Sequence, residues 1–235
     1  MERIAVECTG VIKDFGSGGT KQRVLHGIDW SVPLGATTFL VGPSGCGKTT
    51  LISIIAGLLT ATAGRVRVLD QELTKMRRGK VVRFRADHLG FIFQQFNLLP
   101  SLTAVENAAV SLVVRGSSLA NAKRQASQLL DRLGMSPNKN KYPNQLSGGQ
   151  QQRVAIARAL VHSPQIVISD EPTASLDAET GHEVMELLRE VASGEERAVI
   201  VVTHDNRIFP FADYLATMAD GRIESFRKND TCVNN

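Results

Sequence analysis

The sequence predicts an α/β fold with a mostly parallel sheet, organised around a glycine-rich loop. Continuous apolar runs of strand length alternate with helical stretches, a pattern typical of a sheet covered on both faces. A glycine-rich loop with a lysine stands between one such run and an apolar helix. Two further apolar runs, 165–169 and 198–202, lead directly into polar residues. Because parallel strands end at one edge of a sheet, we expect these polar residues near the loop.

Strands are predicted where β-branched and apolar residues alternate or cluster. Residues 4–8 and 24–32 alternate and flank a glycine-rich segment at 16–19. Residues 214–218 and 222–225 are close enough in sequence to form a terminal hairpin. In chain order the full set is 4–8, 24–32, 36–41, 65–69, 90–93, 165–169, 198–202, 214–218 and 222–225.

Helices are predicted where apolar residues recur every three or four positions. The stretch 119–133 shows this spacing, and Gly134 stands where a helix commonly stops. Asp177 is placed to cap a helix at 178–192. The other expected helices are 50–59, 76–88, 104–114 and 150–160.

Together these elements predict one domain with an inserted part. We expect residues 1–94 and 151–225 to form a catalytic core with an N-terminal antiparallel β subdomain. The stretch 95–150 is helical and lies between two sheet strands, so we interpret it as an inserted helical subdomain. The polar residues 228–235 are expected to be a flexible tail.

Composition excludes little. The 235 residues carry a net charge of +4, which is mild and favours an ordinary solvated surface. Cys8, Cys46 and Cys232 are scattered, so they give neither a disulfide framework nor a metal spacing, and they suit a reducing cytoplasm. No signal peptide is recognisable. No apolar run approaches the roughly 18 residues that a membrane span requires.

The stretch 42–50, GPSGCGKTT, fits the phosphate-binding pattern G-x-x-x-x-G-K-[ST] and predicts a P-loop nucleoside-triphosphatase core. Its glycines lack a Cβ, so backbone N–H groups can approach phosphate oxygens closely. Lys48 would place its charge on the β and γ phosphates, and the Thr49 hydroxyl would bind Mg²⁺. The alternative, a structural turn, is disfavoured by the flanking strand and helix. The expected contacts are Gly42, Pro43, Ser44, Gly45, Cys46, Gly47, Lys48, Thr49 and Thr50.

Polar side chains at three strand ends are candidates for the chemistry. Asp170 and Glu171 follow a buried run, and we expect Asp170 to hold Mg²⁺ and Glu171 to activate the attacking water. His204 follows another apolar strand and is expected to contact the γ-phosphate. Gln94 ends the run GFIF and is expected to hydrogen-bond the metal or its water. Alone, such residues are more often structural, but the phosphate loop reverses that expectation.

The stretch 146–150, LSGGQ, precedes a helix and predicts a second anion site. Ser147, Gly148, Gly149 and Gln150 combine a hydroxyl, exposed N–H groups and a positive helix end. A simple helix cap is the alternative. Two phosphate-type sites on one chain are most simply explained if two copies sandwich each nucleotide.

These motifs, in this order, resemble the ATPase subunit of an ATP-binding cassette (ABC) transporter. The residues that carry the resemblance are GPSGCGKTT, Gln94, LSGGQ, VISDEPTASLD and THD, spread over about 4–225. The longer stretch GFIFQQFNLLPSLTAVEN is similar to the branch that serves lipoprotein release and macrolide or glycolipid export. The resemblance implies ATP and Mg²⁺ as ligands and the ABC ATPase fold.

The resemblance also implies roles for single residues and for partners. Gln94 matches the lid-loop glutamine, Asp177 the loop residue facing the partner subunit, and His204 the switch histidine. Phe15 stands where this branch usually has an adenine-stacking Tyr. The implied assembly is a homodimer with ATP at its interface, bound at the cytoplasmic face of the membrane to a separately encoded integral permease, and in some systems to an extracytoplasmic adaptor.

Other functions fit the sequence less well. An ABC ATPase acting on nucleic acid or ribosomes would carry a long coiled coil or two cassettes, and the sequence has neither feature, so no nucleic acid is expected. A GTPase is excluded because Lys141 stands where the guanine-reading motif requires Asp. Import, and mechanical work across the membrane without a transported solute, remain alternatives to export.

Overall fold

The computed structural model describes residues 3–16, 20–192, 194 and 196–229. It divides into two compact units, residues 1–85 with 194–235 and residues 86–193. The predicted glycine-rich segment 16–19 lies outside the described residues except for Gly16. These units do not test the boundaries of the predicted core, inserted subdomain and tail, which stay a prediction.

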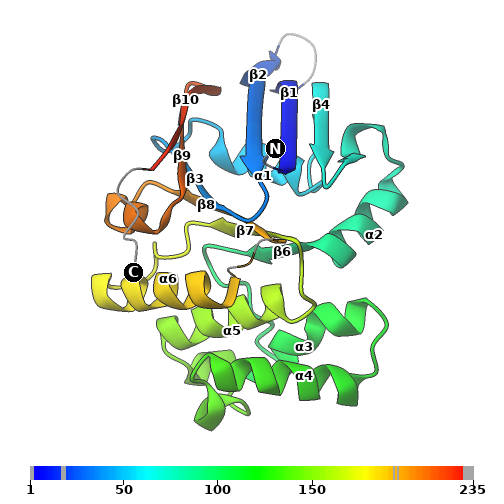
Figure 1. Ribbon diagram of the computed structural model, residues 1–235. Helices are drawn as coiled ribbons and strands as arrows, with labels where there is room; N and C mark the ends of the chain where they lie inside the picture. The colour runs from blue at the N-terminus through cyan, green and yellow to red at the C-terminus, as the bar shows by residue number, and fades with distance from the viewer. Residues whose placement is uncertain (1–2, 17–19, 193, 195, 230–235) are drawn as a thin grey trace. The chain divides into compact units, whose positions relative to one another are not determined.

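The first unit contains the predicted antiparallel β subdomain and a group of parallel strands (Figure 1). Strands β2 (Gln22–Pro33), β1 (Ile4–Phe15), β4 (Ala63–Val68) and β5 (Gln71–Glu72) pair antiparallel in that order. Strand β3 (Thr37–Val41) lies parallel to β8 (Ala198–Thr203) on one side and to β9 (Tyr214–Ala219) on the other. Strand β10 (Arg222–Lys228) closes this group as the predicted hairpin with β9.

Helix α1 (Lys48–Ile55) leaves β3 through the phosphate loop. Short 3-10 turns occupy Leu73–Lys75 and Asn206–Phe211. Helix α2 (Arg78–His88) starts in the first unit and ends in the second.

The second unit is a parallel strand pair with four helices (Figure 1). Strands β6 (Leu89–Ile92) and β7 (Ile166–Asp170) pair directly although about 75 residues separate them, which requires a long crossover. The crossover contains α3 (Ala104–Val114), α4 (Leu119–Arg132) and α5 (Gly148–Leu160), with 3-10 turns at Ser136–Asn138 and Pro143–Gln145. Helix α6 (Ala178–Ala192) follows β7.

The predicted fold class is confirmed, and several element bounds are corrected. Strands β1 and β2 are longer than expected because they pair along nearly their whole length. Helix α1 ends at Ile55 and not at residue 59, because Gly57 adopts φ 64° and the N–H groups of Leu58 and Leu59 turn back to the Ser53 carbonyl. Strand β10 extends to Lys228, and the Asn229 side chain donates to the Phe209 and Ala212 carbonyls. In the part of the chain that the structure describes, no helix is both long and apolar enough to span a bilayer.

Close packing of α5 on β6 depends on Gly90. A Cβ at this position would lie 2.2 Å from the Ala159 carbonyl oxygen and 3.1 Å from Pro164 Cγ. The partners are backbone and a proline ring, which cannot move aside as a flexible side chain could.

We therefore expect Gly90→Ala to lower the free energy of unfolding by about 1–3 kcal/mol, the usual effect of overpacking. The matched control is Gly79→Ala in α2, where a Cβ would meet nothing within 4 Å. That change is expected to raise stability by about 0.5–1 kcal/mol, because alanine is the better helix former. Urea denaturation of both variants measures the difference, and equal stabilities would contradict the packing argument.

Candidate active site

The phosphate loop runs from β3 into α1 and requires glycine at its first position. Gly42 has φ 155°, and a Cβ there would lie 2.0 Å from the Met218 carbonyl oxygen of β9. Gly47 is the N-cap of α1 with φ 106°, a left-handed conformation that other residues rarely adopt. The loop is therefore shaped by backbone that packs against the neighbouring strand.

Lys48 lies inside the curve of this loop. Its Nζ donates to the carbonyl oxygens of Gly42 at 2.7 Å and Pro43 at 2.8 Å, and the residue is buried. The Cys46 Sγ lies 3.9 Å from the same nitrogen. These contacts hold the ammonium group at the centre of the loop, where phosphate oxygens would compete with two uncharged carbonyls for it. The side chain of Thr49 is exposed in the first turn of α1.

His204 stands at the same sheet edge as the loop. Val41, the last residue of β3, pairs with Thr203, the last residue of β8, so the residues that follow both strands are neighbours in register. His204 is exposed, and the next residue, Asp205, is held by the Arg207 guanidinium at 2.8 Å. The predicted placement of His204 at this edge therefore agrees with the strand register, while its contact with phosphate stays a prediction.

In the second unit, Asp170, Glu171 and Gln94 gather at the carboxyl end of the β6–β7 pair. Asp170 ends β7, and Ile92 at the end of β6 pairs with Ser169, so Gln94 follows two residues beyond that pair. Glu171 adopts φ 50°, a conformation unusual for a residue with a side chain and often found at functional sites.

The segment that follows Gln94 is held by Arg158 of α5, a residue that the sequence analysis missed. The Arg158 guanidinium donates to the carbonyls of Phe96 at 2.6 Å and Asn97 at 2.5 Å. Both carbonyls belong to residues with positive φ, 55° and 49°. Burial lowers the pKa of Arg158 below its usual value. The available signal was an arginine within the apolar second half of α5, where a charged residue usually has a specific partner.

Ser147 forms a helix cap, as the alternative interpretation predicted. Its Oγ accepts from the Gln150 N–H at 3.3 Å, and the Gln150 side chain accepts from the Ser147 N–H at 3.1 Å. Gly149 lies close to α6, since a Cβ there would be 2.5 Å from Thr180 Cγ2. The cap leaves Ser147 exposed, so its predicted contact with a nucleotide in a second copy stays open.

Asp177 caps α6 as predicted. Its carboxylate accepts from the Thr180 N–H at 3.0 Å and the Thr180 hydroxyl at 2.7 Å. The N–H of Thr180 is the main cause that lowers the Asp177 pKa. Its role opposite a partner subunit remains an expectation.

The predicted magnesium ligands carry the hard oxygen donors that this ion prefers. In residues 3–229, apart from those that the structure leaves undescribed, no three Asp, Glu, His or Cys side chains cluster as a metal cage. Magnesium usually binds proteins through one or two oxygens and takes its other ligands from water and phosphates. The exposed Thr49 hydroxyl and the Asp170 carboxylate are hard oxygen donors of that kind.

Comparison with known proteins agrees with the sequence resemblance. The family model described as ABC transporter matches residues 25–174. HrtA of Staphylococcus aureus, named for hemin import, is 39% identical over 94% of this chain and 99% of its own length. MacB of Burkholderia thailandensis, a macrolide export ATP-binding/permease protein, is 40% identical over 97% of this chain but only 35% of its own length.

A solved structure with the same fold is the ATP-binding cassette MJ0796, bound to ADP and Pi in a dimeric post-hydrolysis state. Its TM-score to this chain is 0.87 at 36% identity, and the match covers 95% of this chain and 98% of MJ0796.

We expect Arg158→Met to make the segment 94–97 more mobile. Phe96 and Asn97, which have positive φ, would lose the guanidinium that donates to both of their carbonyls. Hydrogen–deuterium exchange of peptides covering this segment should become faster by about an order of magnitude, the usual effect of losing hydrogen bonds to a charged group worth about 1.5 kcal/mol. The control is Arg153→Met on the same helix, since Arg153 contacts the Leu133 carbonyl and Glu183. Faster exchange at 94–97 in both variants, or in neither, would contradict the assignment.

Proposed function

This chain belongs to the ABC transporter family, and from that premise we propose that it is the ATP-hydrolysing subunit that drives a separate membrane permease. The chain is an ABC-type ATPase with the ABC ATPase fold. The proposal is carried by two helix N-termini, each preceded by a glycine-containing motif, which we interpret as phosphate-binding elements. One is the loop 42–50 before α1, and the other is Ser147 with the N-terminus of α5.

The first unit would bind the nucleotide. The loop N–H groups and the N-terminal end of α1 offer donors and positive potential to the phosphates, and Lys48 adds a full charge. Phe15, at the end of β1, would stack on adenine. Mg²⁺ held by Thr49 and Asp170 would neutralise charge on the phosphate oxygens.

Glu171 would be the general base. Its carboxylate follows the strand that carries Asp170, and its backbone conformation sets the direction of the side chain at that strand end. Gln94 would orient the attacking water, and His204 would contact the γ-phosphate. Arg158 supports this chemistry indirectly by holding the segment after Gln94.

The proposed assembly is a homodimer with two ATP molecules at the interface. In that arrangement the loop of one copy and Ser147 of the other enclose each nucleotide. The Ser147 hydroxyl is exposed although it caps α5, and Ser147 and Gln150 bond to each other, which fixes the hydroxyl before any nucleotide arrives. Dimeric MJ0796 supports the proposal as a structural relative.

A surface of the second unit is suited to an apolar partner. Three exposed apolar residues occupy the last two positions of α3 and the first position of α4: Val113 at 40% exposed, Val114 at 71% and Leu119 at 56%. Grouped apolar residues on a surface often mark a protein interface. We propose this surface for contact with the permease, which would keep the subunit at the cytoplasmic face of the membrane.

The direction of transport is proposed as export. The branch resemblance and MacB, named for macrolide export, support it, while HrtA, named for hemin import, supports the alternative. Mechanical work on a partner across the membrane, with an extracytoplasmic adaptor, fits the same ATPase chemistry. The predictions below apply equally to export, to import and to mechanical work across the membrane.

We expect Glu171→Gln to keep ATP binding and to reduce ATP turnover by roughly 10²–10⁴-fold, because it removes the general base. Lys48→Ala should instead weaken binding itself, since it removes the charge on the β and γ phosphates. Phosphate release measures turnover, and equilibrium binding of ATP separates the two effects. Wild-type turnover by Glu171→Gln would exclude this glutamate as the base.

Glu171→Gln with ATP should also form a dimer that the nucleotide-free protein does not form, because each bound ATP stabilises the interface by mass action. Size-exclusion chromatography with and without ATP measures the change. Adding Ser147→Arg should prevent dimer formation while ATP binding to the monomer stays nearly unchanged. An ATP-loaded Glu171→Gln protein that remains monomeric at micromolar concentration would contradict the sandwich.

A further inference from the structure

The ring of Phe15 has a cation on one side. Lys13 and Phe15 are two residues apart near the end of β1. The Lys13 Nζ lies 5.0 Å from the centroid of the Phe15 ring, within the distance of a cation–π interaction. The same nitrogen donates to the Thr60 carbonyl at 2.8 Å, which keeps it in place. The ring itself is 42% exposed.

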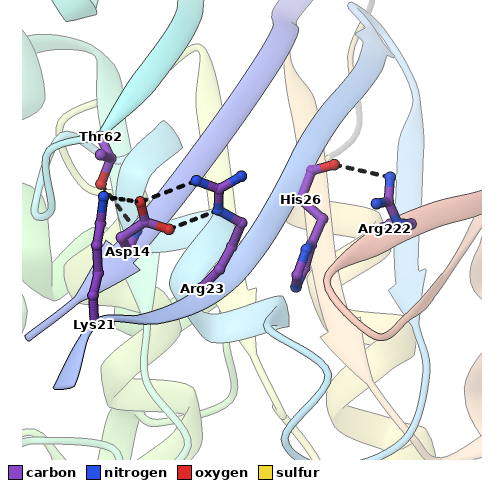
Figure 2. Close-up of polar contacts among 6 residues, drawn as sticks. All are labelled: Asp14, Lys21, Arg23, His26, Thr62 and Arg222. Carbon is purple, nitrogen blue, oxygen red and sulfur yellow. Dashed lines mark hydrogen bonds and ion pairs between the residues drawn. The ribbon is translucent and has the colours of Figure 1, made fainter. Parts of the chain in front are cut away.

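Asp14, between these two residues, ties the end of β1 to β2 (Figure 2). Its carboxylate accepts from Arg23 Nε at 2.8 Å and Nη2 at 3.3 Å, and it pairs with Lys21 Nζ at 2.8 Å. The Asp14 side chain is only 4% exposed. The hydrogen bond from Arg23, followed by that from Lys21, lowers the pKa of Asp14 to about 2, so the carboxylate is charged at neutral pH.

The backbone at Asp14 is fixed as well. Its N–H donates to the Thr62 hydroxyl at 2.9 Å, a contact also drawn in Figure 2. The strand end that carries Phe15 is therefore held by a second strand and by the segment after α1. An exposed ring on so firmly held a backbone is pre-organised for a ligand, which reduces the entropy lost on binding.

The phosphate loop contacts the same strand β2. Lys13 pairs with Leu25, and a Cβ at Gly47 would lie 3.0 Å from Leu25 Cδ2 and 3.3 Å from the Val24 carbonyl oxygen. The Gly221 N–H donates to the Cys46 carbonyl at 3.0 Å. Next to Gly221, Arg222 donates to the His26 carbonyl of β2 at 3.0 Å (Figure 2). The strand opposite Lys13 thus lies against the loop.

From this arrangement we propose that Lys13 is a specificity-determining residue for a purine base, acting through the Phe15 ring, with Asp14 as the positioning residue of the strand end. The proposal rests on the proposed function, since it requires a nucleotide in the phosphate loop. The Lys13 ammonium draws electron density towards its face of the ring. The opposite face becomes less negative and stacks more strongly on an electron-rich base. A purine offers a larger surface to that face than a pyrimidine.

The test compares ligands with and without a base. Imido analogues of ATP and CTP and inorganic tripolyphosphate are titrated against wild type and Lys13→Met, which keeps the length of the side chain but not its charge. We expect Lys13→Met to bind the ATP analogue about 2- to 5-fold more weakly, the range of an exposed cation–π contact. Its affinity for the CTP analogue should fall less, and its affinity for tripolyphosphate should not change. Lys80→Met, at an exposed lysine of α2, is the control and should behave as wild type.

A double-mutant cycle isolates the ring. Phe15→Ala should weaken the ATP analogue by about ten-fold, a typical loss for one stacked base. In the Phe15→Ala background, Lys13→Met should not change the affinity further, because the ring through which Lys13 acts is absent. Asp14→Asn should lower the affinity for the ATP analogue without changing the affinity for tripolyphosphate. Asp14→Glu should restore part of the lost affinity.

The outcomes separate the two proposals. Three results would each overturn the assignment of Lys13. Lys13→Met could weaken the binding of the ATP analogue and of tripolyphosphate equally, or it could keep wild-type affinities. The effects of Lys13→Met and Phe15→Ala on ATP-analogue binding could also be additive. Those results would leave nucleotide binding by the loop intact. Failure of wild type to bind either ligand would overturn the proposed function itself.

Discussion

The steric requirement at Gly42 is the constraint on which the nucleotide site depends. No side chain fits between this residue and the Met218 carbonyl, so the loop can follow its path only with glycine there. The position of the loop is set by β3, which is buried and paired on both sides by β8 and β9. That pairing also fixes where His204 follows β8. The pairing of β3 with β8 and β9 therefore fixes the position of the phosphate loop, which the loop residues alone could not do.

Helix α5 has a comparable part in the second unit. Ser147 caps its N-terminus, and Arg158, three turns later, holds the segment after Gln94. Gly149 and Gly90 allow close approach of this helix to α6 and β6. A displacement of α5 would therefore act on the helix cap and the Gln94 segment together, because both are hydrogen-bonded to the same rigid element.

Elements with strong local signals were predicted well. Helices α3 and α6 have the expected bounds, and each begins at a side-chain cap: Thr103 with Glu106, and Asp177 with Thr180. The end of α1 was predicted four residues too late, since its apolar sequence continues while the backbone turns at Gly57. The identity of the carbonyls that Arg158 contacts was not predictable, because they lie 61 and 62 residues away in the chain and leave no periodic pattern.

The proposed division of the site between two phosphate-binding elements would give the ATPase a physical reason to couple chemistry to assembly. A helix cap such as Ser147 with Gln150 is stable without a ligand, so the second element costs nothing to keep in the monomer. Glu171, the proposed base, has φ 50° without a ligand, so its backbone needs none to reach this conformation. What a lone copy lacks, in the proposed sandwich, is the second anion site over the γ-phosphate. Association would then supply the missing donors, and loss of the γ-phosphate on hydrolysis would remove the charge that holds the two copies together.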